Sequence, residues 1–369
     1  MRTADNQLQL SWLPVTDRLE PSAVPTTYNI YIAEGKNGFD NGRSVSSTSF
    51  TFTPKPNVVY QFRVTAVNRG GESFPSTTLA ACVSAQAGAR DVLVVDGFTR
   101  LAGPAVVDDG TRQGFDLDTD MGVSLGINAG FVGSQLEVAR TRGGSEGPGA
   151  VGSCEDELAG KFVMGKQQNE SVCHVADIAL SGAYNVVSSS VEAVENGFVK
   201  LENYRVVDIM FGLQKDDGYS LVRYKTFSAL LRKALESYVR GNGRVFVSGA
   251  YVASDMQLDA ERSFMSNLFK VGFGGQNTNI STNLVDGLGI SFDIIRRPND
   301  RHYAAQSVDV VSPLAPAFCA MRYADGTDAA VAYDGIDHKA FVMGFPVECI
   351  NNVRSRQQVM KAVMTFLAK

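Results

Sequence analysis

The sequence predicts a multidomain chain of two differently built parts: an all-β sandwich over residues 1–88 and an α/β domain over residues 89–369. Three observations predict this division. Short segments that alternate apolar and polar residues, separated by turn-rich stretches, fill the first part. After residue 89, near-continuous apolar runs recur, as in parallel strands buried on both faces. Helical patterns lie between those runs, and alternating strands and helices are typical of an α/β fold.

The sandwich is predicted from three alternating segments, Gln7–Trp12, Tyr28–Ile32 and Tyr60–Val67. Turn-rich stretches separate them, and one such stretch, Asn68-Arg69-Gly70-Gly71, follows the third segment. Regularly spaced short strands of this kind favour two packed antiparallel sheets.

These segments resemble a fibronectin type III domain. The resemblance rests on Leu10-Ser11-Trp12, on Tyr28-x-Ile30-Tyr31, and on the string from Tyr60 to Ser73. It implies that Trp12 lies in the core, and that the module is a spacer or a weak binder without catalysis. The usual first strand is missing or reduced to a few residues before Gln7. We therefore expect the chain to be a piece of a longer protein, with upstream domains and a signal peptide outside it.

The α/β domain is predicted from five buried strands and three helices. The strands are expected at residues 91–97, 184–188, 206–212, 244–249 and 339–345. The helices are expected at residues 227–239, 260–269 and 353–367, the first ended by Gly241. Shorter strand patterns within residues 280–335 indicate antiparallel additions. Residues 330–333 and 340–343 are expected to form a hairpin leading into the last core strand.

Composition excludes several classes of function. The formal net charge of −5 provides little basic surface for a nucleic-acid backbone. No apolar run approaches the length that spans a bilayer. With three histidines and no CxxC pair, we expect no metal and no cofactor. Cys154 and Cys173 could form a disulfide in an exported protein, and five free thiols are the alternative.

Ligands of open α/β sheets bind beyond the carboxyl ends of the strands, so candidate site residues are taken from those ends. Asp255, Glu348 and Tyr251 are the candidate catalytic residues. The candidate ligand-binding residues from the strand ends are Asp96, Gln214, Lys215 and Ser254. His174 is added because it lies next to Cys173 and three residues before Asp177; a contact at a helix N-terminus or with the lid is expected, and a Cys/His/Asp catalytic group is the alternative. The Gly- and Asp-rich residues 100–182 are too long for an ordinary connection, and we expect them to form a lid or wall over the site.

Three carboxylates at alternate positions, Asp116-x-Asp118-x-Asp120, resemble the start of a calcium-binding loop. A helix–loop–helix calcium site needs Gly at its sixth position and Glu at its twelfth. Met121 and Ile127 occupy those positions here, so that motif fails. We expect a solvated acidic loop, with a looser calcium loop as the alternative.

The order of elements resembles a class I glutamine-amidotransferase-like domain, which implies a flavodoxin-like three-layer fold. Two strings carry the resemblance: Leu235 to Tyr251, which matches the helix, strand and elbow that present the family's cysteine, and Gly344 to Glu348, which matches its His-Pro-Glu triplet. The elbow holds Ala250 and Tyr251 in place of the cysteine. The triplet's histidine is replaced by Phe345 or Val347. Without a thiolate and its base, amidotransferase chemistry is excluded.

The whole chain also resembles secreted bacterial proteins labelled as xanthan lyases, through residues 191–197 and 247–256. This implies a secreted, periplasmic or cell-surface location and a polysaccharide or peptidoglycan ligand. The first hypothesis is a non-catalytic accessory region with a glycan-binding cleft. The alternative is a hydrolase or lyase whose carboxylates Asp96, Asp255 and Glu348 converge beneath residues 100–182, assisted by Lys215 or Tyr251.

Overall fold

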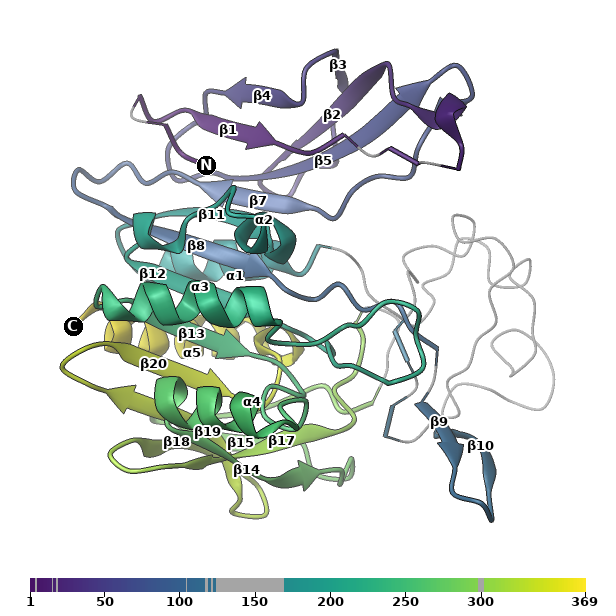
Figure 1. The fold of residues 1–369 in the computed structure, drawn as a ribbon. Helices are drawn as coiled ribbons and strands as arrows, with labels where there is room; N and C mark the ends of the chain where they lie inside the picture. The colour runs from purple at the N-terminus through teal and green to yellow at the C-terminus, as the bar shows by residue number, and fades with distance from the viewer. Residues whose placement is uncertain are drawn as a thin grey trace.

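The structure is a computed structural model of the whole chain. It describes residues 1–3, 5–14, 16–17, 19–103, 105–116, 119–120, 122–123, 169–297 and 302–369. Its first part is built from seven strands: β1 (Leu8–Ser11), β2 (Thr27–Glu34), β3 (Arg43–Val45), β4 (Ser49–Phe52), β5 (Val59–Asn68), β6 (Gly71–Glu72) and β7 (Leu79–Cys82). Strand β1 pairs with β4, while β2, β3, β5, β6 and β7 form the facing sheet (Figure 1). The predicted sandwich is therefore confirmed.

A large mixed sheet runs through the second part. Its parallel core consists of β8 (Arg90–Asp96), β11 (Tyr184–Ser190), β12 (Val206–Met210), β13 (Arg244–Ser248) and β20 (Lys339–Met343). All five predicted core strands are confirmed. Antiparallel strands extend it as β19 (Asp328–Asp334), β18 (Phe318–Tyr323), β15 (Leu284–Gly287) and β16 (Ile290–Asp293), and β19–β20 is the predicted hairpin. Strands β9 (Ala105–Asp108) and β10 (Gln113–Asp116) pair separately, as do β14 (Val271–Asn277) and β17 (Val308–Pro313).

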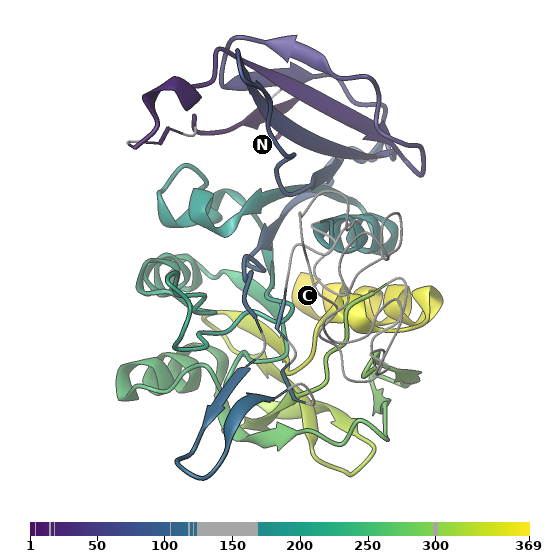
Figure 2. The ribbon, with the colours of Figure 1, turned by 90° about the vertical axis from the view of Figure 1, so that its right-hand side faces the viewer.

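Helices cover both faces of this sheet. On one face lie α1 (Ser171–Ser181) and α5 (Val353–Ala368), and on the other lie α2 (Val191–Glu195), α3 (Ala229–Arg240) and α4 (Asp259–Phe264) (Figure 2). The three predicted helices are confirmed. Ser228 begins α3 by accepting a hydrogen bond from the amide of Leu231, as an N-cap residue does, and α4 continues as a π-helical turn, Met265–Phe269.

The two parts share one sheet rather than meeting across a linker. Strand β7 pairs with β5 on one side and with β11 on the other, so the sheet continues from the sandwich into the parallel core (Figure 1). The Ser188 hydroxyl of β11 also bonds the backbone of Ala80. Arg2 adds a two-nitrogen ion pair to Asp91 of β8, at 2.9 and 2.8 Å. Buried apolar residues of the sandwich and of the parallel strands accordingly belong to common core clusters.

Because of this shared sheet, we expect both parts to unfold in one transition. Trp12, the sole tryptophan of the sequence, packs on Tyr28 in the sandwich, so its fluorescence reports the first part. Among the described residues, every α-helix lies in the second part, so far-ultraviolet circular dichroism at 222 nm, which is dominated by helix, reports that part. The two signals should follow the same urea curve. A fluorescence transition at clearly lower urea would show that the sandwich unfolds alone.

Candidate functional site

A sharp turn follows β13 at the carboxyl edge of the sheet, where an amidotransferase would present its nucleophile. Ala250 is fully buried there and has no reactive atom. The next free amides of the turn, those of Ala253 and Ser254, both donate to one carboxylate oxygen of Asp309 in β17, at 2.7 and 2.8 Å. These two amides of the turn are therefore engaged by a side chain of the protein and are not available to an oxyanion.

Tyr251, a candidate catalytic residue, is buried in this turn and retains 3% exposure. Its hydroxyl donates to the carbonyl of Thr119 at 3.4 Å, and the ammonium of Lys215 lies 4.7 Å from the centre of its ring. Burial, followed by the charge of Asp120, raises the pKa of Tyr251 well above its usual value. The phenol therefore stays protonated at neutral pH and is poorly suited to act as a base.

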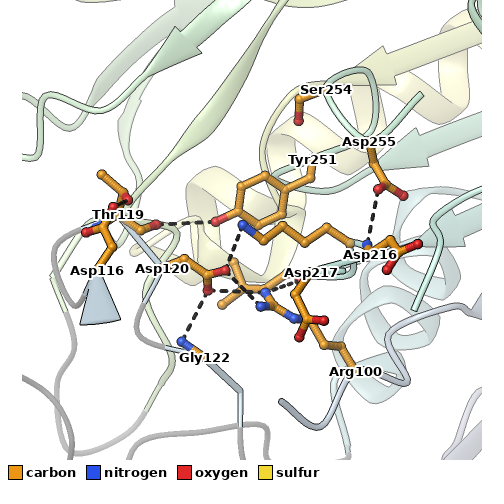
Figure 3. Close-up of polar contacts among 12 residues, drawn as sticks. Arg100, Asp116, Thr119, Asp120, Gly122, Asp216, Asp217, Tyr251, Ser254 and Asp255 are labelled. Carbon is orange, nitrogen blue, oxygen red and sulfur yellow. Dashed lines mark hydrogen bonds and ion pairs between the residues drawn. The ribbon is translucent and has the colours of Figure 1, made fainter. Parts of the chain in front are cut away.

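Asp255, the second candidate catalytic residue, holds the loop between β12 and α3. Its carboxylate accepts a hydrogen bond from the amide of Asp216 at 3.1 Å (Figure 3). It also accepts the amide and hydroxyl of Thr226, at 2.8 and 3.0 Å. Burial raises its pKa despite these donors and the nearby charge of Lys225. Asp255 does not cap a helix, because α4 begins only at Asp259, and Glu261 accepts the amides of Gln257 and Leu258 before it.

Glu348, the third candidate, belongs to a buried chain of four polar side chains. His174, in the first turn of α1, places Nδ1 2.7 Å from Asp208 Oδ2 and Nε2 3.2 Å from Glu348 Oε2. The other oxygen of Glu348 accepts a hydrogen bond of 2.6 Å from the hydroxyl of Tyr303. Asp208 comes from the middle of β12, and both it and His174 are fully buried.

The charges of His174, Asp208 and Glu348 act on one another's pKa values. Burial lowers the pKa of His174, but the charge of Asp208 and the two carboxylate hydrogen bonds outweigh it, so the pKa is raised well above its usual value. Burial raises the pKa of Asp208 despite the imidazolium beside it. For Glu348, the hydrogen bonds from His174 and Tyr303 overcome burial and lower the pKa. The imidazolium of His174 therefore forms an ion cluster with the two carboxylates. A protonated ring has no free lone pair, so it cannot act as a base.

The structure does not bring Asp255 together with Glu348. The partners of Asp255 come from the β12–α3 loop, whereas those of Glu348 come from α1 and the segment before β17. The carboxylate of Asp96 is buried and accepts the amide of Phe98 at 3.0 Å. The convergence expected for the carboxylate hydrolase is thus not met for Asp255. The catalytic roles of these residues remain predictions.

The candidate binding residues Gln214 and Lys215 hold the segment that follows β8. Gln214 accepts the amides of Thr99 and Arg100 at 2.9 and 2.8 Å. The ammonium of Lys215 lies 2.7 Å from Asp120 Oδ2. The fully buried Arg100 donates one nitrogen to each oxygen of the same carboxylate, at 3.2 and 2.8 Å (Figure 3). Ser254 donates its amide to Asp309, and its hydroxyl lies 3.4 Å from the side-chain amide of Gln276.

The expectation of a solvated acidic loop is wrong for Asp120, which is 5% exposed. Burial raises its pKa, but the charges of Arg100 and Lys215 outweigh burial and leave the pKa below its usual value. Asp118 lies outside the described residues, as does most of residues 100–182. In the described parts of that segment, the carbonyl of Thr119 accepts the hydroxyl of Tyr251, and α1 packs on the sheet. The lid remains a prediction.

Four important residues were missed at the sequence level: Arg100, Asp208, Tyr303 and Asp309. Two of them carried a readable signal. Asp208 interrupts the apolar run Val206-Val207-Asp208-Ile209, and Asp309 interrupts Val308-Asp309-Val310. A carboxylate inside a strand buried on both faces requires a partner, so each predicts a buried polar contact. Tyr303 had no comparable signal, because its contact depends on the path of an irregular segment.

Thiols and metals give no further site. Burial raises the pKa of Cys173 to about 11, and its thiol donates to the carbonyl of Glu170 at 3.1 Å. Cys154 lies outside the described residues, so its pairing with Cys173 remains a prediction. Within the described part of the chain, no cluster of three His, Cys, Asp or Glu side chains could bind a metal ion. The helices of that same part are too short or too polar to cross a bilayer.

Asp309→Asn tests how Asp309 occupies the turn after β13. Burial raises the pKa of Asp309 to about 6, from 3.8. One of its oxygens finds no hydrogen-bond donor among the described residues. A raised pKa contributes stability that is complete below pH 3.8 and is lost as pH rises through 6, an effect of about 2–3 kcal/mol. The neighbouring titratable groups, Tyr251 and Tyr323, stay neutral in this range.

In urea unfolding from pH 4 to pH 8, the Asp309→Asn protein should show a flatter decline of unfolding free energy than the wild type between pH 4 and pH 6. Asp328→Asn removes a carboxylate from the neighbouring strand β19 and is the control variant. Equal slopes in the wild type and Asp309→Asn would mean that Asp309 is ionised normally.

Comparison with known proteins settles the first part of the chain. The family model for the fibronectin type III domain matches residues 1–81. Residues 1–81 form a fibronectin type III domain. Its match ends within β7, the strand that the fibronectin type III domain shares with the large sheet. No curated protein matches the chain.

Three solved structures share part of the arrangement at low identity. An exo-β-1,4-mannosidase from Opitutaceae bacterium strain TAV5 is 12% identical over 53% of this chain and 29% of its own, with a TM-score of 0.31. The twitchin kinase region of C. elegans is 24% identical over 21% of this chain and 14% of its own, with a TM-score of 0.19. The cytoplasmic protein STM1381 from Salmonella typhimurium LT2 is 9% identical over 74% of this chain and 95% of its own, with a TM-score of 0.37. This chain thus spans less than a third of the mannosidase, and these similarities assign no activity.

Proposed function

We propose that the chain is a non-catalytic accessory region of a secreted or cell-surface bacterial protein that processes polysaccharide or cell wall. In this proposal, residues 89–369 are a class I glutamine-amidotransferase-like domain of flavodoxin-like, three-layer architecture that has lost its reaction. The carboxyl edge of the sheet then binds a glycan or peptidoglycan instead of cleaving it. The chain would work beside catalytic domains of a longer protein.

The loss of catalysis is supported by the positions that match the family's reactive groups: they are replaced by unreactive residues or engaged by other side chains. Ala250 replaces the nucleophile, and Asp309 occupies the amides of the turn. Phe345 and Val347, the two residues that could match the family's histidine, are both fully buried. Glu348, which matches the family's glutamate, is held by His174 and Tyr303. A carboxylate with both oxygens so engaged, away from solvent, has no access to a substrate.

The location and the ligand class rest on the resemblance in residues 191–197 and 247–256. The fibronectin type III domain supports the same reading, because such modules accompany catalytic domains as spacers or weak binders. Helices on both faces of a parallel core support the three-layer assignment.

Binding and turnover should be measured on the same purified chain. We expect it to co-sediment with peptidoglycan sacculi or to be retarded in gels that contain xanthan, and to release no reducing ends or unsaturated products from either. Failure to bind any polysaccharide or peptidoglycan would contradict the ligand part of the proposal.

Glu348→Gln keeps the shape of the side chain and separates the two hypotheses. If turnover is found and Glu348→Gln abolishes it, while the variant stays folded by circular dichroism, the chain is an enzyme and the proposal is wrong. A turnover that persists equally in Glu348→Gln and in the control Glu236→Gln would place catalysis elsewhere and would also overturn it.

A further inference from the structure

Three donors converge on the carboxylate of Asp120 at the carboxyl edge of the sheet. Arg100 supplies two nitrogens at 3.2 and 2.8 Å, Lys215 supplies its ammonium at 2.7 Å, and Gly122 donates its amide at 3.1 Å (Figure 3). Two cations therefore face one anion in a site where all three side chains are largely removed from water.

The cations are held in place independently of Asp120. Arg100 follows β8, and its amide is fixed by Gln214, while its guanidinium also donates to the carbonyl of Leu213 at 3.3 Å. Lys215 follows β12 and lies over the ring of Tyr251. Both thus come from the ends of adjacent parallel strands, the position at which open α/β sheets bind ligands. Asp120 comes instead from the segment that lies across this edge.

Such a geometry is that of a ligand site filled by the protein's own side chain. A guanidinium that offers two nitrogens and an ammonium beside it match one carboxylate group. Lys215 retains 23% exposure, so solvent reaches one side of the pair. An incoming carboxylate could approach Lys215 first and then replace Asp120 on Arg100 without removing either cation from its support.

We propose that Arg100 and Lys215 form a binding site for a carboxylate-bearing ligand, and that Asp120 occupies this site as an autoinhibitory contact. The carboxylate belongs to an acidic sugar or to the end of a peptide, the two forms in which cell-surface polymers carry it. This inference rests on the proposed function, because it assigns the ligand chemistry of the same sheet edge.

Asp120→Asn tests the internal competition. The substitution keeps the shape of the side chain and removes its charge. D-glucuronate or the dipeptide Ala-Ala should therefore bind to the Asp120→Asn protein about tenfold more tightly than to the wild type. Isothermal titration calorimetry gives the affinity, and D-glucose is the neutral control. The ligand should also raise the melting temperature of the Asp120→Asn protein, since two buried cations regain an anion. Preference for glucuronate over Ala-Ala, or the reverse, identifies the source of the carboxylate.

Asp177→Asn is the matched control. Asp177 is equally buried and pairs with Arg356 at 2.6 Å, so its loss also leaves a guanidinium without its carboxylate, but at a helix pair rather than at the sheet edge. This variant should gain no affinity for either probe. Lys215→Met should lose binding in the wild-type background and in the Asp120→Asn background.

The proposal is overturned if Asp120→Asn and Asp177→Asn bind the probes equally weakly. Should Asp120→Asn not fold, the wild type is titrated with glucuronate at high concentration, and binding that Lys215→Met leaves unchanged overturns the proposal. Failure of this carboxylate site and failure of the proposed function give different results. Polysaccharide binding without any carboxylate preference leaves the proposed function standing and removes this site. Carboxylate binding without polysaccharide or peptidoglycan binding does the opposite.

Discussion

Replacing His174 with Ala should lower the free energy of unfolding at pH 7 by about 3–5 kcal/mol. The substitution leaves Asp208 and Glu348 buried without the imidazolium that lies 2.7 and 3.2 Å from them. Two uncompensated carboxylates in a dry interior cost far more than the lost packing of one ring. Urea unfolding followed by circular dichroism gives the value directly.

The control for this variant is His338→Ala. His338 is also buried, but its neighbouring carboxylate, Asp337, is exposed and can be hydrated after the substitution. His338→Ala should therefore cost less than His174→Ala. A triple variant, His174→Leu, Asp208→Leu and Glu348→Leu, should be less destabilised than His174→Ala alone, since it strands no charge. If His174→Ala costs no more than His338→Ala, the ion cluster is not a stabilising feature.

The same cluster sets a direction for the effect of pH. The raised pKa of His174 means that its contribution is complete below pH 6.5 and is lost as pH rises through the folded-state value. The lowered pKa of Glu348 means that its contribution is present above pH 4.5 and is lost as pH falls through its folded-state value. His174→Ala should remove the first of these dependences.

Phe345→Ala should also destabilise the protein by about 3–5 kcal/mol. The ring is fully buried directly after β20, with the rings of Phe292 and Tyr323 centred 6.0 and 6.2 Å away. The backbone around it cannot close the cavity, because an added methyl at the preceding Gly344 would already lie 2.1 Å from the carbonyl oxygen of Asp309. Thermal and urea unfolding measure the loss.

Phe366→Ala provides the comparison for this cavity. Phe366 packs on Phe318 and Phe341 but is only half-buried, so water can fill the space that it leaves. Its substitution should cost clearly less than Phe345→Ala. Equal losses would indicate that the space around Phe345 is not tightly filled.

The fold was largely predictable because its signals are local. The alternation in Tyr60–Val67 and the apolar run in Val92–Val95 each report the environment of a single strand. The sharing of β7 was not predictable, because it depends on which edge of the sandwich meets β11. The sequences of β7 and β11 resemble those of ordinary strands and do not show which neighbours the two strands will have.

The candidate site was only partly predictable, since the carboxyl ends of strands name residues but not their directions. The sequence named Lys215 and His174 as candidates, and the structure places both in polar clusters. Their partners there, Asp120 and Asp208, were not identified as such from the sequence. Asp255 and Glu348 both follow core strands and still contact different neighbours, because one residue belongs to a turn that folds back on the β12–α3 loop. Contacts between separate segments, such as that of His174 with Asp208, carry no periodic signal in the chain.

The strand shared between the sandwich and the parallel core has a consequence for geometry at a distance. A module joined through a flexible tether samples many separations, whereas β7 is hydrogen-bonded on both sides and permits one. The outer strands β2 and β3 therefore stand at one distance and one angle from the edge where β8, β12 and β13 end.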